Sequence, residues 1–333
     1  MKTPAADDPF GERTPSVSNA QLSVLGCDVS VDSTDHALLN LAIDAFGDLP
    51  RYRLGGRPPT LNVKLVLTYH ERSWLRDADP PRPVLSSGNG LLCATTDPGN
   101  FAIVDVPMSR ALICVSADML QYPYHARYEL IELAFLTLAS RARSLVPLHT
   151  ACVGSNGSGL LLMGSTGTGK STLGLHALAL GMQFLADDSA FVAPASLKIT
   201  GVPNYLYLQR GTLDFLAPGQ LRRQIQGSPK IRRRSGVQKY QANLRELHGK
   251  IARGPLQLAA MVMLSRRSVT KQPALKPVSR KTFLVKLRRE QPYATGMSNW
   301  EEFERRIADV RTYELRRTQH PDSAVRELQA LLG

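Results

Sequence analysis

The segment 164–171, with the sequence GSTGTGKS, constrains the fold of this chain more than any other feature. It satisfies the pattern G-x-x-x-x-G-K-[ST], follows an apolar stretch at 159–163 and precedes a helical stretch at 170–180. In such a loop the glycines let successive backbone N–H groups point at phosphate oxygens, and the start of the helix adds unpaired N–H groups and its positive dipole end. The sequence therefore predicts a strand, a phosphate-binding loop and a helix.

Two side chains of this loop have specific expected roles. Lys170 would bring a positive charge to the β- and γ-phosphates, and the Ser171 hydroxyl would ligate Mg²⁺. We expect nucleotide contacts from the whole loop and the residue that follows it: Gly164, Ser165, Thr166, Gly167, Thr168, Gly169, Lys170, Ser171 and Thr172.

Two adjacent aspartates, Asp187 and Asp188, follow a short apolar strand at 182–186. Ligands of α/β sheets bind at the C-terminal ends of the strands, so both carboxylates can lie near the nucleotide. Because side chains alternate across a strand, we expect them to point in different directions and to have two roles. The alternative is a structural turn, since Asp-Asp-Ser is good turn chemistry.

A histidine is predicted to lie opposite the start of the loop. Asn156-Gly157 is a strong signal for a two-residue hairpin turn between strands at 148–153 and 159–163. With these two residues at the centre, paired positions sum to 313, and His149 faces Gly164. A slip of one residue would turn His149 to the other face and make it a structural residue instead.

The rest of the chain predicts an α/β protein of two domains after a mobile tail. Short alternating strands between Pro- and Gly-rich turns, with one helix at 37–46 and a loop at 80–90, indicate a strand-rich α+β domain. A long amphipathic helix at 124–143 leads into the domain that carries the loop. The expected limits are 1–17 for the tail, 18–120 for the N-terminal domain and 121–333 for the second domain.

Charge is concentrated in one region of the sequence. The chain has a net charge of +13, and 220–290 contains nineteen Lys or Arg against two acids. We expect 221–236 to be an exposed, mobile loop. Such a region can attract nucleic acid, anionic lipid, phosphates or an acidic protein. No apolar run is long enough to span a membrane, and the polar, acidic N-terminus favours a cytoplasmic protein without membrane contact.

These residues together resemble the C-terminal domain of the bacterial HPr kinase/phosphorylase family. The likeness lies in the histidine before the loop, G-x-x-G-x-G-K-S, a short helix ending in glycine and a strand closing on Ala-Asp-Asp, and it covers 148–192 well. The chain looks more like divergent members, some of which phosphorylate a serine of a lasso peptide. The family's acidic signature has no counterpart at 200–204.

The resemblance implies a P-loop kinase domain that uses ATP and Mg²⁺ to phosphorylate a serine hydroxyl of a peptide or small protein. Asp187 would be the base toward that hydroxyl, His149 would assist it, and Lys170 would serve the phosphates. Ser171 and Asp188 would hold the metal. The chain can also form a homo-oligomer.

Two other classes of function remain open from the residues alone. A hydrolytic P-loop ATPase or GTPase would share the loop, although the sequence has no N-K-x-D for guanine and no S-G-G-Q-like segment. A nucleotide-sensing or nucleic-acid-binding regulator could use the basic region. Nucleic acid is not expected as a partner, because no helix-turn-helix, zinc spacing or aromatic RNA-binding signature is present.

Overall fold

The computed structural model describes residues 16–69, 74, 78–247, 250–269 and 273–333. Most of the tail expected at 1–17 therefore lies outside the described residues. The chain divides into two compact units, Met1–Leu49 with Gly55–Arg143 and Pro50–Leu54 with Ser144–Gly333. The division falls after Arg143 and not near residue 120, because the helical segment before Arg143 packs on the sheet of the first unit. The chain is a mixed α/β protein.

The first unit is built on a sheet with the order β1-β2-β3-β7-β6-β5-β4. β2 pairs with β3, and β3 with β7, in parallel; the other neighbours are antiparallel. The strands are β1 (Ser18–Val24), β2 (Cys27–Ser33), β3 (Thr60–Thr68), β4 (Val84–Gly88), β5 (Leu91–Asp97), β6 (Asn100–Asp105) and β7 (Arg110–Ser116).

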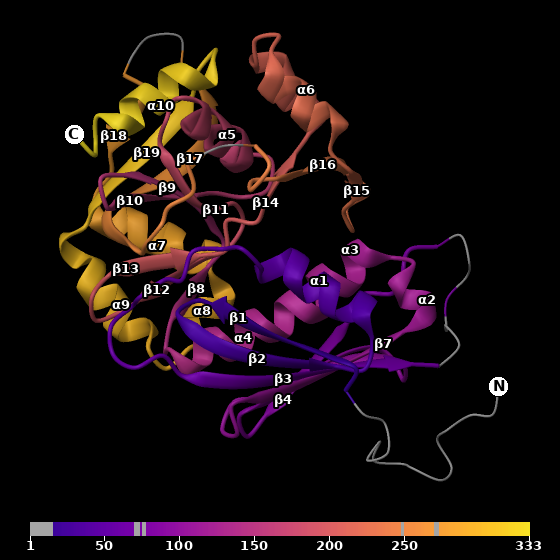
Figure 1. The fold of residues 1–333 in the computed structure, drawn as a ribbon. Helices are drawn as coiled ribbons and strands as arrows, with labels where there is room; N and C mark the ends of the chain where they lie inside the picture. The colour runs from indigo at the N-terminus through magenta and orange to yellow at the C-terminus, as the bar shows by residue number, and fades with distance from the viewer. Residues whose placement is uncertain (1–15, 70–73, 75–77, 248–249, 270–272) are drawn as a thin grey trace. The chain divides into compact units, whose positions relative to one another are not determined.

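Helices α1 and α4 pack against this sheet (Figure 1). The rings of Phe46 in α1 and Phe135 in α4 stack with centroids 5.0 Å apart. Asp35 begins α1 by accepting a hydrogen bond from the Leu38 N–H at 3.0 Å. The helices of this unit are α1 (His36–Phe46), α2 (Ala117–Leu120), α3 (Pro123–His125) and α4 (Glu132–Ala142), with a π-helical segment Ala126–Ile131 before α4.

The loop expected at 80–90 contains a strand, β4. Every residue of β4 is exposed, and the strand pairs only with β5 at the edge of the sheet. The prediction was wrong because a strand held only by backbone hydrogen bonds, with no buried face, leaves no alternation of apolar residues in the sequence.

The second unit is built on a larger sheet with the order β11-β9-β10-β17-β13-β12-β8; β19 pairs with β17, and β18 pairs with β19. β10, β17 and β19 run parallel to one another. The strands are β8 (Val146–Leu148), β9 (Thr150–Ser155), β10 (Ser158–Met163), β11 (Gln183–Ala186), β12 (Ala190–Ala193), β13 (Lys198–Gly201), β17 (Leu256–Ser268), β18 (Leu275–Pro277) and β19 (Arg311–Arg317).

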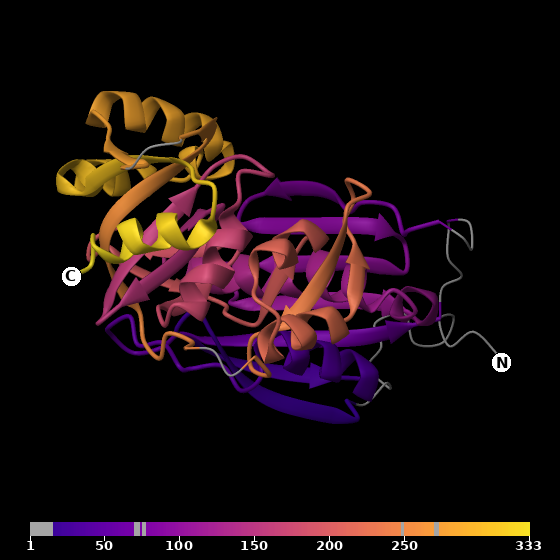
Figure 2. The same cartoon turned by 90° about the horizontal axis from the view of Figure 1, so that it is seen from above.

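Two buried cores lie on the opposite faces of this sheet. Alternate residues of β10 enter different cores, with Leu160 in one and Leu161 in the other. Helices α5 (Lys170–Ala179) and α10 (Pro321–Gln329) cover the first core side by side (Figures 1 and 2). Three helices cover the second core: α7 (Arg280–Glu290), α8 (Pro292–Thr295) and α9 (Trp300–Arg306).

The basic region expected as a mobile loop at 221–236 is ordered into a helix and most of a hairpin. Helix α6 (Gln220–Gly227) precedes β15 (Lys230–Arg232), which pairs with β16 (Gln238–Asn243), and β16 pairs with β14 (Tyr205–Leu208). The apolar residues Leu221 and Ile225, four positions apart, pack this helix onto the first core. Because most residues around this pair are charged or polar, the sequence shows no apolar helical face and did not predict the helix.

Candidate functional site

The glycine-rich loop connects the C-terminal end of β10 to the start of α5, as predicted. Gly167 and Gly169 have φ angles of +83° and +102°, a region that residues with a Cβ rarely adopt. The Lys170 side chain folds back over the loop, and its Nζ donates to the Gly164 carbonyl at 2.6 Å. Lys170 is only 6% exposed, so the loop holds its ammonium group inward and not in open solvent.

The hairpin before the loop has the predicted register. Ser155 pairs with Ser158 and Thr150 with Met163, so paired positions sum to 313. Asn156 and Gly157 both have positive φ, as a type I′ turn requires. His149 comes immediately before the last paired residue and lies in a break between β8 and β9.

The sheet divides into two branches at the level of His149. On one side of the division β8 pairs with β12, with Leu148 opposite Ala190. On the other side β9 pairs with β11, with Cys152 opposite Ala186. The chain passes from one branch to the other twice: through His149, between β8 and β9, and through 187–189, between β11 and β12. The division therefore brings the histidine and both aspartates to the same edge of the sheet.

Asp187 is almost fully buried at 5% exposure. Its Oδ2 accepts a hydrogen bond from the Tyr207 N–H of β14 at 3.1 Å, and the Ser171 hydroxyl also stabilises the charged form. Oδ1 is buried without a hydrogen bond of standard geometry to any described residue. Burial, followed by the charge of Asp188, raises the pKa of Asp187 to about 7. The positive charge of Lys239 lowers this pKa, but by less than burial and Asp188 raise it.

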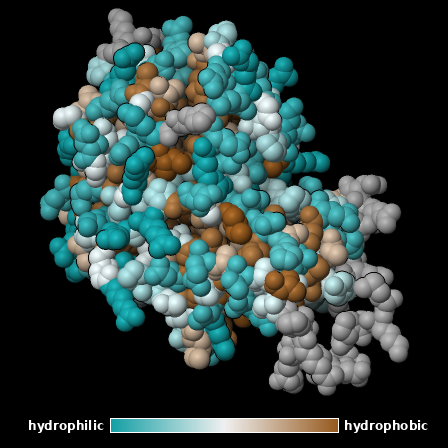
Figure 3. Space-filling view, in the orientation of Figure 1, coloured by the Kyte–Doolittle hydropathy of each residue, from teal (hydrophilic) through white to brown (hydrophobic). Residues whose placement is uncertain are grey.

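Asp188 has a different partner from Asp187, and this partner is positively charged. Its Oδ2 accepts from the Arg233 guanidinium at 2.8 Å, and both side chains are partly exposed. The same guanidinium lies over the Tyr207 ring, 4.4 Å from its centroid. The turn between β15 and β16, which the sequence did not connect with the site, thereby reaches the aspartate pair. The surface over α6 and this hairpin is mostly hydrophilic (Figure 3).

His149 is positioned by a residue 142 places further along the chain. The side-chain amide of Gln291 accepts from the His149 N–H at 2.8 Å and donates to the His149 carbonyl at 3.3 Å. Protein packed around the ring and the charge of Lys170 lower the pKa of His149, whereas the charge of Asp188 and a hydrogen bond to its backbone act in the opposite direction. The imidazole is therefore mainly neutral near pH 7 and lies beside both Lys170 and Asp188.

Two further charged residues near the loop were missed in the sequence. Glu290, at the end of α7, is close enough to Lys170 to raise its pKa, together with the two aspartates, against a larger lowering by burial. Arg266, near the end of β17, donates to the Thr166 carbonyl at 2.8 Å. Neither residue belongs to a motif with the loop in the sequence. Each comes from a distant element, α7 or β17, that the fold brings next to the loop.

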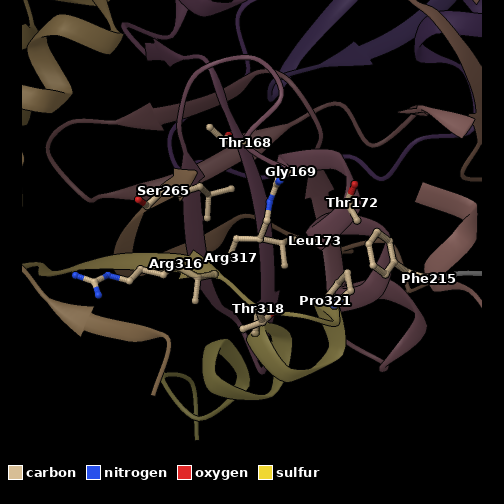
Figure 4. Close-up of a pocket in the computed structure, with 13 residues that line it drawn as sticks. Thr168, Gly169, Thr172, Leu173, Phe215, Ser265, Arg316, Arg317, Thr318 and Pro321 are labelled. Carbon is tan, nitrogen blue, oxygen red and sulfur yellow. The ribbon is translucent and has the colours of Figure 1, made fainter. Parts of the chain in front are cut away.

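A pocket of about 230 Å³ opens beside the loop at the C-terminal ends of the parallel strands (Figure 4). In that view the Phe215 ring lies beside Thr172 and Pro321. The lining residues are Thr168, Gly169, Thr172, Leu173, Phe215, Leu264, Ser265, Leu315, Arg316, Arg317, Thr318, Pro321 and Ala324. Most of their side chains are apolar or carry hydroxyl groups, and none is a carboxylate.

The expected loop residues, His149, Asp187 and Asp188 thus lie together at one edge of the sheet. The roles assigned to them remain predictions. No family model matches the chain, and no curated protein matches it. Among solved structures, the HPr(Ser) kinase/phosphatase from Coxiella burnetii is similar over 55% of this chain and 96% of that chain, with 12% sequence identity and a TM-score of 0.27. The chain is therefore only a distant structural neighbour of that protein.

Proposed function

We propose that the second unit is an ATP- and Mg²⁺-dependent kinase that transfers the γ-phosphoryl group to a serine hydroxyl of a peptide or small protein. The observation that carries the proposal is the meeting of four groups at one sheet edge: the glycine-rich loop, Lys170, the two aspartates and His149. Phosphoryl transfer requires a phosphate cradle, positive charge, a metal and a carboxylate toward the acceptor. Each has a candidate among these residues.

The donor set on the loop side suits a magnesium ion. Mg²⁺ prefers oxygen ligands, and Ser171 offers a hydroxyl beside the buried Asp187 carboxylate. The Oδ1 atom of Asp187 without a standard hydrogen bond, and the raised pKa of this group, both fit a position that gains a cation on substrate binding. Bound there, Mg²⁺ would neutralise charge that develops on the β- and γ-phosphate oxygens. We assign Ser171 and Asp187 to the metal.

The more exposed aspartate suits the acceptor side. Asp188 is accessible to an incoming hydroxyl, and its Oδ1 can take the proton while Arg233 holds Oδ2. The acceptor oxygen forms a bond to the γ-phosphorus, the bond from that phosphorus to the β–γ bridging oxygen breaks, and ADP leaves with the electron pair. His149 orients this carboxylate through its contact with the Asp188 backbone. This proposal exchanges the two aspartate roles expected from the sequence.

The basic residues beside Asp188 support a macromolecular acceptor. Arg233 contacts Asp188, and Lys239 of β16 is close enough to act on the charges of Lys170 and Asp187. The hairpin that carries them can hold an acidic peptide or small protein next to the transferred phosphoryl group. Water is then the competing acceptor to be excluded.

The test is incubation with γ-labelled ATP and candidate acceptors, followed by mass spectrometry of the products. We expect slow ATP consumption by the protein alone and faster consumption with phosphoserine formation when the acceptor is added. The Asp188→Asn variant should bind ATP but lose transfer, whereas Asp28→Asn, on the exposed surface of the first unit, should behave as wild type. Fast ATP hydrolysis that no acceptor changes would contradict the kinase and support an ATPase.

A further inference from the structure

The pocket beside the glycine-rich loop is continuous with the loop itself. Thr168 and Gly169 line the pocket and also belong to the loop, and Thr172 and Leu173 extend the lining along α5. A ligand whose phosphates contact the loop amides therefore has its remaining part directed at this pocket. The opposite wall comes from the ends of β17 and β19 and the start of α10.

Phe215 is an exposed aromatic residue at this pocket. It lies at the end of the 3₁₀ segment Arg210–Phe215, and 39% of it is exposed. An apolar ring left in water at the wall of a pocket is typical of a ligand contact. Its planar face suits a flat aromatic ligand, because stacking of two flat rings buries area on both and is energetically favourable.

Phe215 and the 3₁₀ segment that carries it are held in place although the ring is exposed. His320 Nε2 contacts the Phe215 carbonyl at 3.1 Å, and since a carbonyl only accepts, His320 donates. The Thr212 hydroxyl bonds the Thr172 hydroxyl at 3.0 Å, which ties the same 3₁₀ segment to α5. The buried ring of His176 lies edge-on to Phe215, with centroids 6.4 Å apart. The aromatic wall is thus formed before a ligand binds, which lowers the entropy cost of binding.

The geometry points to this pocket as the site of an adenine base, with Phe215 stacked on it and the triphosphate on the loop. The inference rests on the proposed function only in taking the loop as the phosphate site. Guanine presents an N1–H and an exocyclic amine that are usually satisfied by a carboxylate. The lining contains no Asp, Glu, Asn or Gln side chain among the described residues. The hydroxyls of Ser265 and Thr318 can instead serve the polar edge of adenine.

The test is isothermal titration of the full chain with Mg²⁺ and three ligands: ATP, GTP and inorganic tripolyphosphate. We expect ATP to bind about tenfold more tightly than tripolyphosphate, since stacking of one base is worth about that factor. We expect ATP to bind more tightly than GTP as well, because the lining has no carboxylate for the guanine N–H groups. Phe215→Ala should remove this advantage and leave tripolyphosphate binding unchanged. Thr318→Trp, which fills the pocket, should act in the same way. The matched control is Tyr293→Ala, an aromatic residue that is 61% exposed and does not line the pocket.

The outcomes separate this inference from the proposed function. Equal binding of ATP and tripolyphosphate to the wild type, or an ATP advantage that survives both pocket variants, overturns the base site while the loop remains a phosphate site. Failure of tripolyphosphate to bind overturns the phosphate role of the loop, and with it the proposed function. Phe215 is half-exposed, so its truncation should leave the melting temperature near that of wild type, and this keeps the comparison valid if Thr318→Trp folds poorly.

Discussion

The contiguous stretch 148–192 and the distant segments that surround it contribute different things to the candidate site. The stretch supplies the groups to which we assign the chemistry: the loop, Lys170, His149 and the two aspartates. The distant segments supply the hydrogen-bond partners that position these groups. Gln291 bonds the His149 backbone, Arg233 donates to Asp188, and the Tyr207 N–H donates to Asp187. The proposed reactive groups are thus close together in the sequence, whereas the residues that position them come from distant segments of the fold.

The largest expected effect of a substitution belongs to the contiguous stretch. Lys170→Ala should lower phosphoryl transfer about 10³-fold, because the ammonium group stabilises charge that grows on the phosphates in the transition state. ATP turnover with the acceptor is the measurement. Lys198→Ala, on an exposed strand position, is the matched control. Equal turnover in the two variants would show that the Lys170 contact with Gly164 is only structural.

Substitution of the two aspartates should give two different defects. Asp187→Asn should raise the Mg²⁺ concentration needed for half-maximal rate, since it weakens a metal ligand. Asp188→Asn should lower kcat about 10²-fold at unchanged Mg²⁺ requirement, since it removes the proton acceptor. Magnesium titrations of the rate distinguish them. The reverse pattern would restore the roles expected from the sequence.

A smaller loss of activity is expected when the hydrogen bonds from the Gln291 side chain to the His149 backbone are removed. Gln291→Leu should lower kcat about tenfold with little change in the KM for ATP, because His149 loses both backbone contacts. The effect should be much smaller in a His149→Gln background, since Gln291 acts through that histidine. Gln319→Leu, at an exposed position, controls for the change of residue type. Full additivity of the two substitutions would make Gln291 a structural residue only.

The smallest effect should appear in the pH dependence of stability. The pKa of Asp187 is raised to about 7 in the folded chain, so its favourable contribution is present below its usual pKa and lost as pH rises through about 7. A Mg²⁺ ion held by Asp187 when ATP binds would add positive charge beside this carboxylate. The gain in melting temperature on adding both should therefore be larger at about pH 8 than at about pH 5.5. Asp187→Asn should remove the difference, and a gain independent of pH in the wild type would contradict it.

The same division explains what could be predicted from the sequence. Asn156-Gly157 predicted the hairpin register as far as the pair of Thr150 and Met163, and His149 lies next to this pair and close to Lys170. Nothing local to Gln291 or Phe215 marks either as part of the site, because their roles depend on packing between elements far apart in the chain. The sequence did not predict helix α6 for a related reason: Leu221 and Ile225 are its only apolar side chains, too few to show a helical period.

The branching of the sheet at His149 has a consequence for local motion. In an unbroken strand the amide of this residue would be protected by a neighbouring strand, but here the acceptor is the Gln291 side chain. Opening of the corner between α7 and α8 would expose the His149 amide to hydrogen exchange without disturbing a strand pair. The exchange rate of this amide would then report how often its hydrogen bond to Gln291 opens. A ligand that stabilises the corner would lower this exchange rate.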